Sequence, residues 1–141
     1  MLGEGPQLGE LEALAASLGI ADRVQFLGFR ANPFALFARA SVFILSSRYE
    51  GFGNVLAEAL ACGTPIVSTD CESGPAEILG GGAYGRLVPV GDDAAMAVAI
   101  EQSLTDPIDP AKLKTRSKSF TVDVAARQYI ALYDKVLGQP G

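Results

Sequence analysis

The chain has 141 residues, of which 49% are hydrophobic and 19% are charged, and its formal net charge is −5. This length and composition predict one compact globular domain and exclude a disordered chain. The acidic balance argues against nucleic acid as a partner, because a nucleic-acid-binding surface needs clustered positive charge.

The sequence contains no histidine and only two cysteines, Cys62 and Cys71. Their spacing does not resemble a zinc site, and a serine or cysteine nucleophile would lack its usual histidine base. We therefore expect no metal and no other cofactor. No apolar run approaches the roughly 20 residues that span a bilayer. We expect a cytoplasmic location with free thiols, and peripheral attachment to a membrane is left open for a longer protein.

Helix and strand patterns alternate along the chain, which is typical of a parallel sheet covered by helices. Leucines at helical spacing predict a helix over residues 6–18, and a short apolar run predicts a strand at 24–27. Residues 32–39 have the start signals of a second helix. The run 42–45 does not alternate, which predicts a strand that is buried on both faces and central in the sheet.

The second half of the chain continues this alternation, so the expected fold class is α/β, with a Rossmann-like parallel sheet and flanking helices. The basic residues of segment 112–118 are interpreted as a solvated surface. The expected elements are a helix at 54–62, a strand at 65–69, a loop at 71–85 with one helical turn near 76–79, a strand at 86–90, a helix capped by Asp92, and a last helix with the apolar stripe Ala125, Tyr129, Leu132 and Val136.

Two glutamates, Glu50 and Glu58, flank a glycine-bearing turn where the strand at 42–45 passes into a helix. Glycines let backbone N–H groups approach a ligand, a helix start attracts anions, and carboxylates bind sugar hydroxyls. Loops at the carboxyl ends of parallel strands converge, so residues 28–32 and 70–75 are expected beside the turn at 46–53. These features suit a sugar nucleotide, although each one alone is also common in ordinary turns and helix starts.

A set of segments carries a specific resemblance: Ser47, residues 50–53, residues 56–65, residues 77–79 and residues 87–92. Together they resemble the C-terminal, donor-binding domain of group 1 retaining glycosyltransferases, which have the two-domain GT-B fold. The similarity runs from Gly3 to about Leu137. It implies that residues 1–141 are part of a domain that binds a nucleotide sugar, with the UDP-linked form favoured. The enzyme would transfer a hexose or N-acetylhexosamine with retention, in glycan or polysaccharide biosynthesis.

The resemblance also implies a role for each candidate residue. Glu58 would bind the ribose, and Glu50 would contact the transferred sugar near the reacting carbon, as an electrostatic and positioning residue. For Glu77, a part in the site and a capping role stay open, and the rings of Tyr49 and Phe52 are expected to pack. The remaining candidates act through the backbone: Gly51, Phe52 and Gly53 toward the sugar, Asn54, Val55 and Leu56 toward the diphosphate or ribose, and Phe29 and Arg30 toward the base.

The resemblance further implies that the family's first βα unit, the next strand and the N-terminal acceptor domain are not encoded in these 141 residues, and we expect them to be absent from this chain. The missing unit would carry a basic pair for the diphosphate, so we expect the isolated chain to be inactive without an N-terminal domain or a second chain. Either residues 24–27 pair with the strand at 42–45, or the open sheet edge recruits another chain as a dimer. The alternative function is a non-catalytic nucleotide-sugar-binding or assembly module that needs a partner chain.

Overall fold

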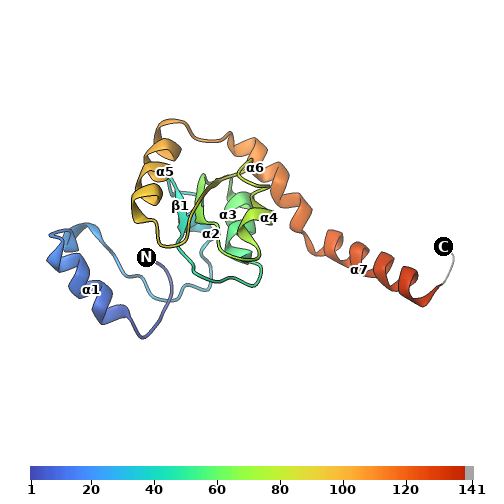
Figure 1. Ribbon diagram of the computed structural model, residues 1–141, viewed down its shortest axis with the longest axis horizontal. Coiled ribbons are helices and arrows are strands. Elements are labelled where there is room, and N and C mark those ends of the chain that lie inside the picture. The colour runs from blue at the N-terminus through green and yellow to red at the C-terminus, as the bar shows by residue number, and fades with distance from the viewer. Residues whose placement is uncertain (139–141) are drawn as a thin grey trace. The chain divides into compact units, whose positions relative to one another are not determined.

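The computed structural model describes residues 1–138, so the last three residues of the predicted domain lie outside the described part of the chain. The chain forms two compact units, one comprising Met1–Pro33 and the other starting at Phe34 (Figure 1). Among the described residues, no helix combines the length and the apolarity that crossing a membrane requires.

The N-terminal unit contains helix α1 (Leu8–Ser17) and a short 3-10 helix, η1 (Ala21–Arg23). Helix α1 confirms the helix predicted at residues 6–18. The strand predicted at 24–27 is wrong, so of the two expected alternatives the one that needs this strand fails, and recruitment of another chain stays a prediction. The segment instead bonds to the start of the chain, where Leu27 N–H donates to the Met1 carbonyl at 2.9 Å. A few hydrogen bonds to so short a partner do not build a strand.

The second unit contains three parallel strands, β1 (Phe43–Leu45), β2 (Ile66–Thr69) and β3 (Arg86–Val88), in the order β1-β2-β3. This sheet confirms the predicted α/β class. Strand β2 is the central one and is buried along its whole length. The prediction that residues 42–45 are central is wrong, because β1 pairs with β2 alone among the described strands. Ile44 in β1 is accordingly 45% exposed.

Helices cover both faces of this sheet, and most predicted boundaries hold within a few residues. Helix α3 has the predicted bounds, because Gly63 in the left-handed conformation ends it. Asp92 caps α5 as predicted, by accepting a hydrogen bond from Ala95 N–H at 2.8 Å. The helices are α2 (Phe34–Phe37), α3 (Asn54–Cys62), α4 (Pro75–Ile78), α5 (Asp93–Thr105), α6 (Pro110–Ser117), the 3-10 helix η2 (Lys118–Phe120) and α7 (Val122–Leu137).

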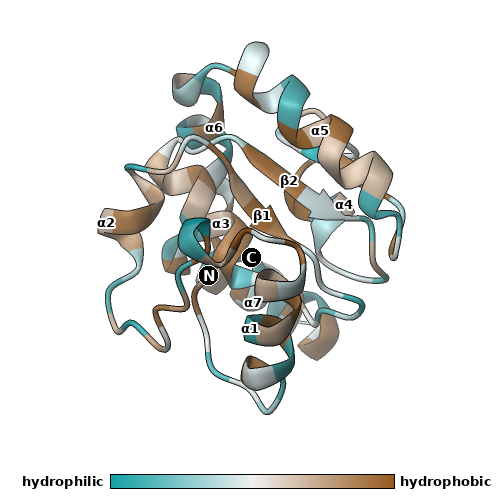
Figure 2. Cartoon of the chain, turned by 90° about the vertical axis from the view of Figure 1, so that its left-hand side faces the viewer, coloured by the Kyte–Doolittle hydropathy of each residue, from teal (hydrophilic) through white to brown (hydrophobic). Residues whose placement is uncertain are grey.

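The core has two parts, one on each face of the sheet. Strand side chains alternate between the faces, and the hydrophobic residues along β1 and β2 stand out in Figure 2. On one face, Val67 and Val88 pack with Ala99 of α5. The other face is covered by α3, α4 and α6, with Leu56, Ala59, Leu60, Ile66, Ile78, Leu79 and Leu113 at its centre. The helices on the two faces thus hold the paired strands β1 and β2, whose carboxyl ends lie side by side.

Candidate functional site

The turn between β1 and α3, residues 46–53, lies at the carboxyl end of the sheet. It ends at Gly53, which has a φ of 84° and comes directly before α3. L-amino acids rarely adopt this left-handed conformation, so the turn requires glycine here. The Gly53 carbonyl then accepts the Leu56 N–H at 2.9 Å and starts the helix. The turn therefore presents the N-terminus of α3 beside the strand ends.

Glu50 lies half-buried in this turn, and its carboxylate has a fixed partner. The Ser47 hydroxyl donates to Glu50 Oε1 at 2.7 Å. Ser47 is itself held by β2, because the Thr69 hydroxyl donates to the Ser47 carbonyl at 2.5 Å. A chain of hydrogen bonds thus connects the end of the central strand with the candidate catalytic carboxylate.

A second loop, residues 70–75, follows β2 and touches the first. A Cβ added to Gly74 would lie 2.2 Å from the Phe52 carbonyl oxygen, so only glycine allows this backbone-to-backbone approach. The predicted convergence is confirmed for these two loops. Phe29 and Arg30, from the third predicted loop, belong to the N-terminal unit, and their part in the site stays a prediction.

Three candidate residues, Phe52, Asn54 and Glu77, line one pocket of about 650 Å³. The Phe52 ring meets the Phe120 ring edge-on, with 5.7 Å between the ring centres. Phe52 therefore packs, as expected, whereas Tyr49 is 84% exposed and does not pack. The rest of the pocket wall comes from the C-terminal helices and comprises Arg116, Ser119, Phe120, Thr121, Val122, Ala125, Gln128, Tyr129 and Leu132.

Arg116 fixes one wall of this pocket. Its guanidinium donates to the Glu77 carbonyl at 2.6 Å and to the Ile78 carbonyl at 3.0 Å, and it lies 4.8 Å from the centre of the Phe120 ring. Carbonyls at the end of a helix lack partners within it, and the arginine satisfies two of them in α4. The interpretation of segment 112–118 as a solvated surface is therefore wrong at Arg116.

Glu58 lies on α3 one helical turn after Asn54, so both side chains project from the same side of the helix. Leu56 is fully buried and its backbone N–H already donates to the Gly53 carbonyl, so it offers a ligand neither its side chain nor its N–H. One turn further, burial raises the pKa of the Cys62 thiol; nearby Glu58 adds to this increase, and Lys114 opposes it. In the described part of the chain, no three His, Cys, Asp or Glu side chains gather as a metal site would require.

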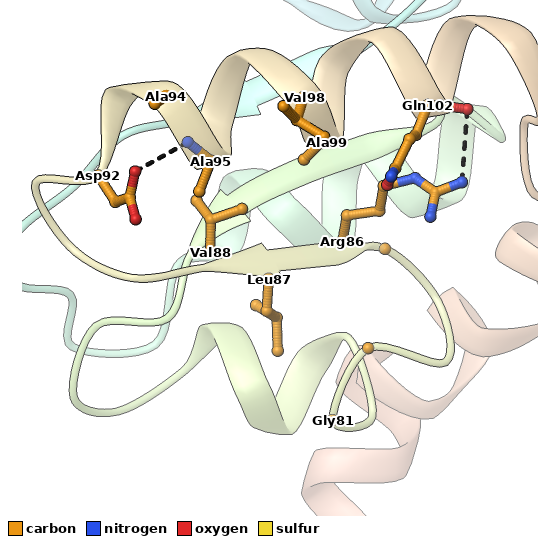
Figure 3. Close-up of a pocket in the computed structure, with 12 residues that line it drawn as sticks. Gly81, Arg86, Leu87, Val88, Asp92, Ala94, Ala95, Val98, Ala99 and Gln102 are labelled. Atoms are coloured by element: carbon orange, nitrogen blue, oxygen red, sulfur yellow. Dashed lines mark hydrogen bonds between the residues drawn. The ribbon is translucent and has the colours of Figure 1, made fainter.

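A second hollow, of about 680 Å³, lies along α5 and β3 and contains none of the predicted site residues (Figure 3). Its two charged side chains already stabilise the ends of α5. Asp92 caps the start of the helix, and Arg86 donates to the Gln102 carbonyl at 3.4 Å and the Asp106 carbonyl at 3.1 Å. The candidate site is therefore the one formed by the two loops, despite the size of this hollow.

Fold and candidate site together define a Rossmann-like α/β unit with two loops in contact at the carboxyl ends of parallel strands. The sequence model of the family described as glycosyl transferases group 1 matches residues 1–120. The chain therefore belongs to this family, as the resemblance indicated, and its structural neighbours are GT-B glycosyltransferases.

Two bacterial glycosyltransferases are among the relatives that the chain resembles. The chain is 39% identical over 124 residues to the Campylobacter jejuni N-acetylgalactosamine-N,N'-diacetylbacillosaminyl-diphospho-undecaprenol 4-alpha-N-acetylgalactosaminyltransferase, covering 85% of this chain and 34% of that protein. It is 37% identical over 130 residues to the lipopolysaccharide core biosynthesis glycosyltransferase LpsE of Rhizobium meliloti, covering 92% and 38%. The chain thus spans well under half the length of these relatives.

Among solved structures, Anabaena HepE in complex with UDP superposes with a TM-score of 0.75 at 27% identity, over 96% of this chain and 40% of HepE. A second structure of HepE, with UDP-glucose, gives the same TM-score at 29% identity. Sequence reasoning identified Glu50 and the turn glycines but missed the roles of Thr69, Arg116 and Phe120. These contacts join residues more than 20 positions apart, and no local pattern predicts them.

Proposed function

We propose that the chain is the donor-binding part of a glycosyltransferase that transfers a hexose or N-acetylhexosamine from a UDP-linked donor, with retention, in polysaccharide or lipopolysaccharide assembly. The observation that carries this proposal is the contact between the two loops at Gly74 and Phe52. Glu50 supports it as well, because its Cγ would lie 4.0 Å from a Cβ added to Gly53, the residue directly before α3. The UDP and UDP-glucose complexes of HepE support the same class of ligand.

In this proposal the ligand extends from the turn onto helix α3. Glu50 and the backbone of residues 51–53 bind the sugar, and the N–H groups of residues 54 and 55, at the start of the helix, bind the diphosphate. Glu58, one turn further along α3, accepts hydrogen bonds from the ribose hydroxyls. The order sugar, diphosphate, ribose therefore follows the order of the residues in the sequence.

Gly51 supports the placement of the sugar. Its φ does not require glycine, and a Cβ added to it would meet nothing within 4 Å. The space above this backbone is therefore open, and a sugar ring can approach the N–H groups closely. The fold of the described residues gives no other reason for glycine at this position.

The reaction proposed for this site takes place on one face of the sugar. The acceptor hydroxyl loses its proton to the leaving diphosphate, while the new oxygen–carbon bond forms on the face from which that diphosphate departs. Glu50 does not bond to the sugar; its negative charge stabilises the positive charge that develops at the reacting carbon. The acceptor is held by an N-terminal domain or by a second chain.

The alternative is a non-catalytic nucleotide-sugar-binding or assembly module that needs a partner chain. The observation that favours it is the use of two arginines by the fold itself. Arg86 bonds to carbonyls at the end of α5, and Arg116 bonds to carbonyls at the end of α4. Neither guanidinium is free to neutralise a diphosphate, so these two arginines add no countercharge to the site.

Calorimetric titration of the chain with UDP, GDP, ADP and their glucose conjugates tests the proposal. We expect UDP and UDP-glucose to bind most tightly. Glu58→Ala should weaken the binding of both by at least about tenfold, because a carboxylate that accepts two hydroxyls is lost. Glu101→Ala, which removes an exposed glutamate of α5, is the matched control and should bind like the wild type.

The outcomes separate the two functions. Equal binding by Glu58→Ala and the wild type would contradict the ribose assignment. Binding without transfer, even after an N-terminal acceptor domain is supplied, would favour the non-catalytic module. If the wild type binds none of the nucleotides, the chain is not a donor-binding unit.

A further inference from the structure

Ser47 belongs to the motif of the turn, yet the proposed function gives it no role. Its hydroxyl donates to Glu50 Oε1 at 2.7 Å, within a half-buried part of the turn. A hydrogen bond to an ionised carboxylate is about twice as strong as one between neutral groups. Ser47 therefore restrains the rotation of the Glu50 side chain before any ligand arrives.

The Ser47 backbone is restrained in turn by the central strand. Thr69 is the last residue of β2 and is buried, and its hydroxyl lies 2.5 Å from the Ser47 carbonyl and 3.4 Å from the Leu45 carbonyl. Because β1 and β2 are parallel, the chain leaves both strands at the same edge of the sheet. One hydroxyl can thus fix the direction in which the turn leaves β1.

We propose that Ser47 and Thr69 are positioning residues for Glu50: Ser47 occupies one carboxylate oxygen and leaves the other directed at a hydroxyl of the donor sugar. This inference rests on the proposed function, because it assumes that Glu50 meets the sugar. A carboxylate that is oriented in advance loses less conformational entropy when the donor binds. The restraint should therefore strengthen the binding of the sugar part of the ligand and leave the binding of the nucleotide part unaffected.

The test compares UDP-glucose with UDP on the whole chain, by calorimetry. Ser47→Ala should weaken UDP-glucose binding by about fivefold to tenfold and change UDP binding by less than twofold. Ser47→Thr keeps the hydroxyl and should restore most of the affinity. Ser41→Ala, at an exposed serine before β1, is the matched control and should have no effect on either ligand.

A double-variant cycle tests whether Ser47 acts through Glu50. Once Glu50→Ala has removed the carboxylate, adding Ser47→Ala should cause no further loss of UDP-glucose affinity. Thr69→Val removes the second hydroxyl with little change of shape and should weaken UDP-glucose binding by about threefold, whereas Thr69→Ser should not. Thermal unfolding of each variant shows whether the fold is intact.

Several results would overturn the inference while the proposed function stands. They are equal weakening of UDP and UDP-glucose by Ser47→Ala, additive losses in the double variant, or failure of Ser47→Thr to restore binding. If Ser47→Ala does not fold, the comparison of Ser47→Thr with Thr69→Val decides in its place. If the wild type binds neither ligand, the proposed function itself fails, and the positioning role fails with it.

Discussion

Helices α3 and α7 carry similar apolar stripes in the sequence but differ completely in burial. Helix α3 buries Leu56, Ala59 and Leu60 against the sheet and α6. Helix α7 buries no residue, and Tyr129 and Leu132 of its stripe are 64% and 56% exposed. The spacing of apolar residues determines which face of a helix is apolar, but not whether the folded chain covers that face.

Truncating the core of α3 should have the largest effect. Leu60 is fully buried between the sheet and α6, so Leu60→Ala removes packed methyl groups and leaves a cavity. We expect the free energy of unfolding to fall by about 2 to 5 kcal/mol. Urea denaturation followed by circular dichroism measures this change, and a loss below about 1 kcal/mol would show that α3 is packed more loosely than described.

A smaller effect is expected at the contact between the two loops. Gly74→Ala places a methyl group against the Phe52 carbonyl and in a left-handed backbone conformation, so the loops must separate. We expect a loss of about 1 to 3 kcal/mol of stability, together with weaker UDP-glucose binding. Gly51→Ala is the matched control for stability, because its methyl group meets nothing, and it should change unfolding by less than about 0.5 kcal/mol.

Removing Arg116, the arginine that joins α6 to α4, should lower the free energy of unfolding by less than Gly74→Ala does. Arg116→Met keeps the aliphatic stem but removes the hydrogen bonds to the Glu77 and Ile78 carbonyls. We expect a loss of about 1 to 2 kcal/mol, measured by the same denaturation. Lys112→Met is the control, because it removes an ammonium that lies 5.3 Å from the centre of the Tyr84 ring. Equal losses in both variants would mean that the carbonyl contacts contribute little.

The smallest effect is expected on α7. Leu132→Ala removes the same number of atoms as Leu60→Ala, but from an exposed side chain. We expect the free energy of unfolding to change by less than about 0.5 kcal/mol. A loss comparable to that of Leu60→Ala would reveal that α7 is covered in solution, and the comparison between the two helices would no longer hold.

Local signals predicted most of the fold, because they act over a few residues. Gly63 and the helix formers before it define α3, and the acceptor side chain of Asp92 defines the start of α5. The segment at 24–27 was predicted incorrectly because a strand exists only if a partner pairs with it. The apolar residues of β1 do not predict its place at the edge of the sheet either, because that place depends on how many strands pair with it.

The residues of the candidate site also fall into two groups, those that the sequence predicts and those that only the structure reveals. Glu50, the turn glycines and Glu58 stand in one short stretch, and their pattern alone directs attention to them. Arg116 bonds to carbonyls 38 and 39 residues earlier, and Thr69 bonds to a carbonyl 22 residues earlier. Their side chains show no preference for such partners in the sequence, so only the folded chain reveals that they hold the site together.

The open space above Gly51 has a practical consequence. Folding and ligand recognition are usually difficult to vary independently, since a substitution in a binding loop commonly disturbs both. At Gly51 the backbone accepts a side chain and no neighbour within 4 Å resists it. In the proposed function, a graded series of residues that starts with Gly51→Ala would measure the depth available to the sugar, because the first added carbon leaves the packing of the turn unchanged.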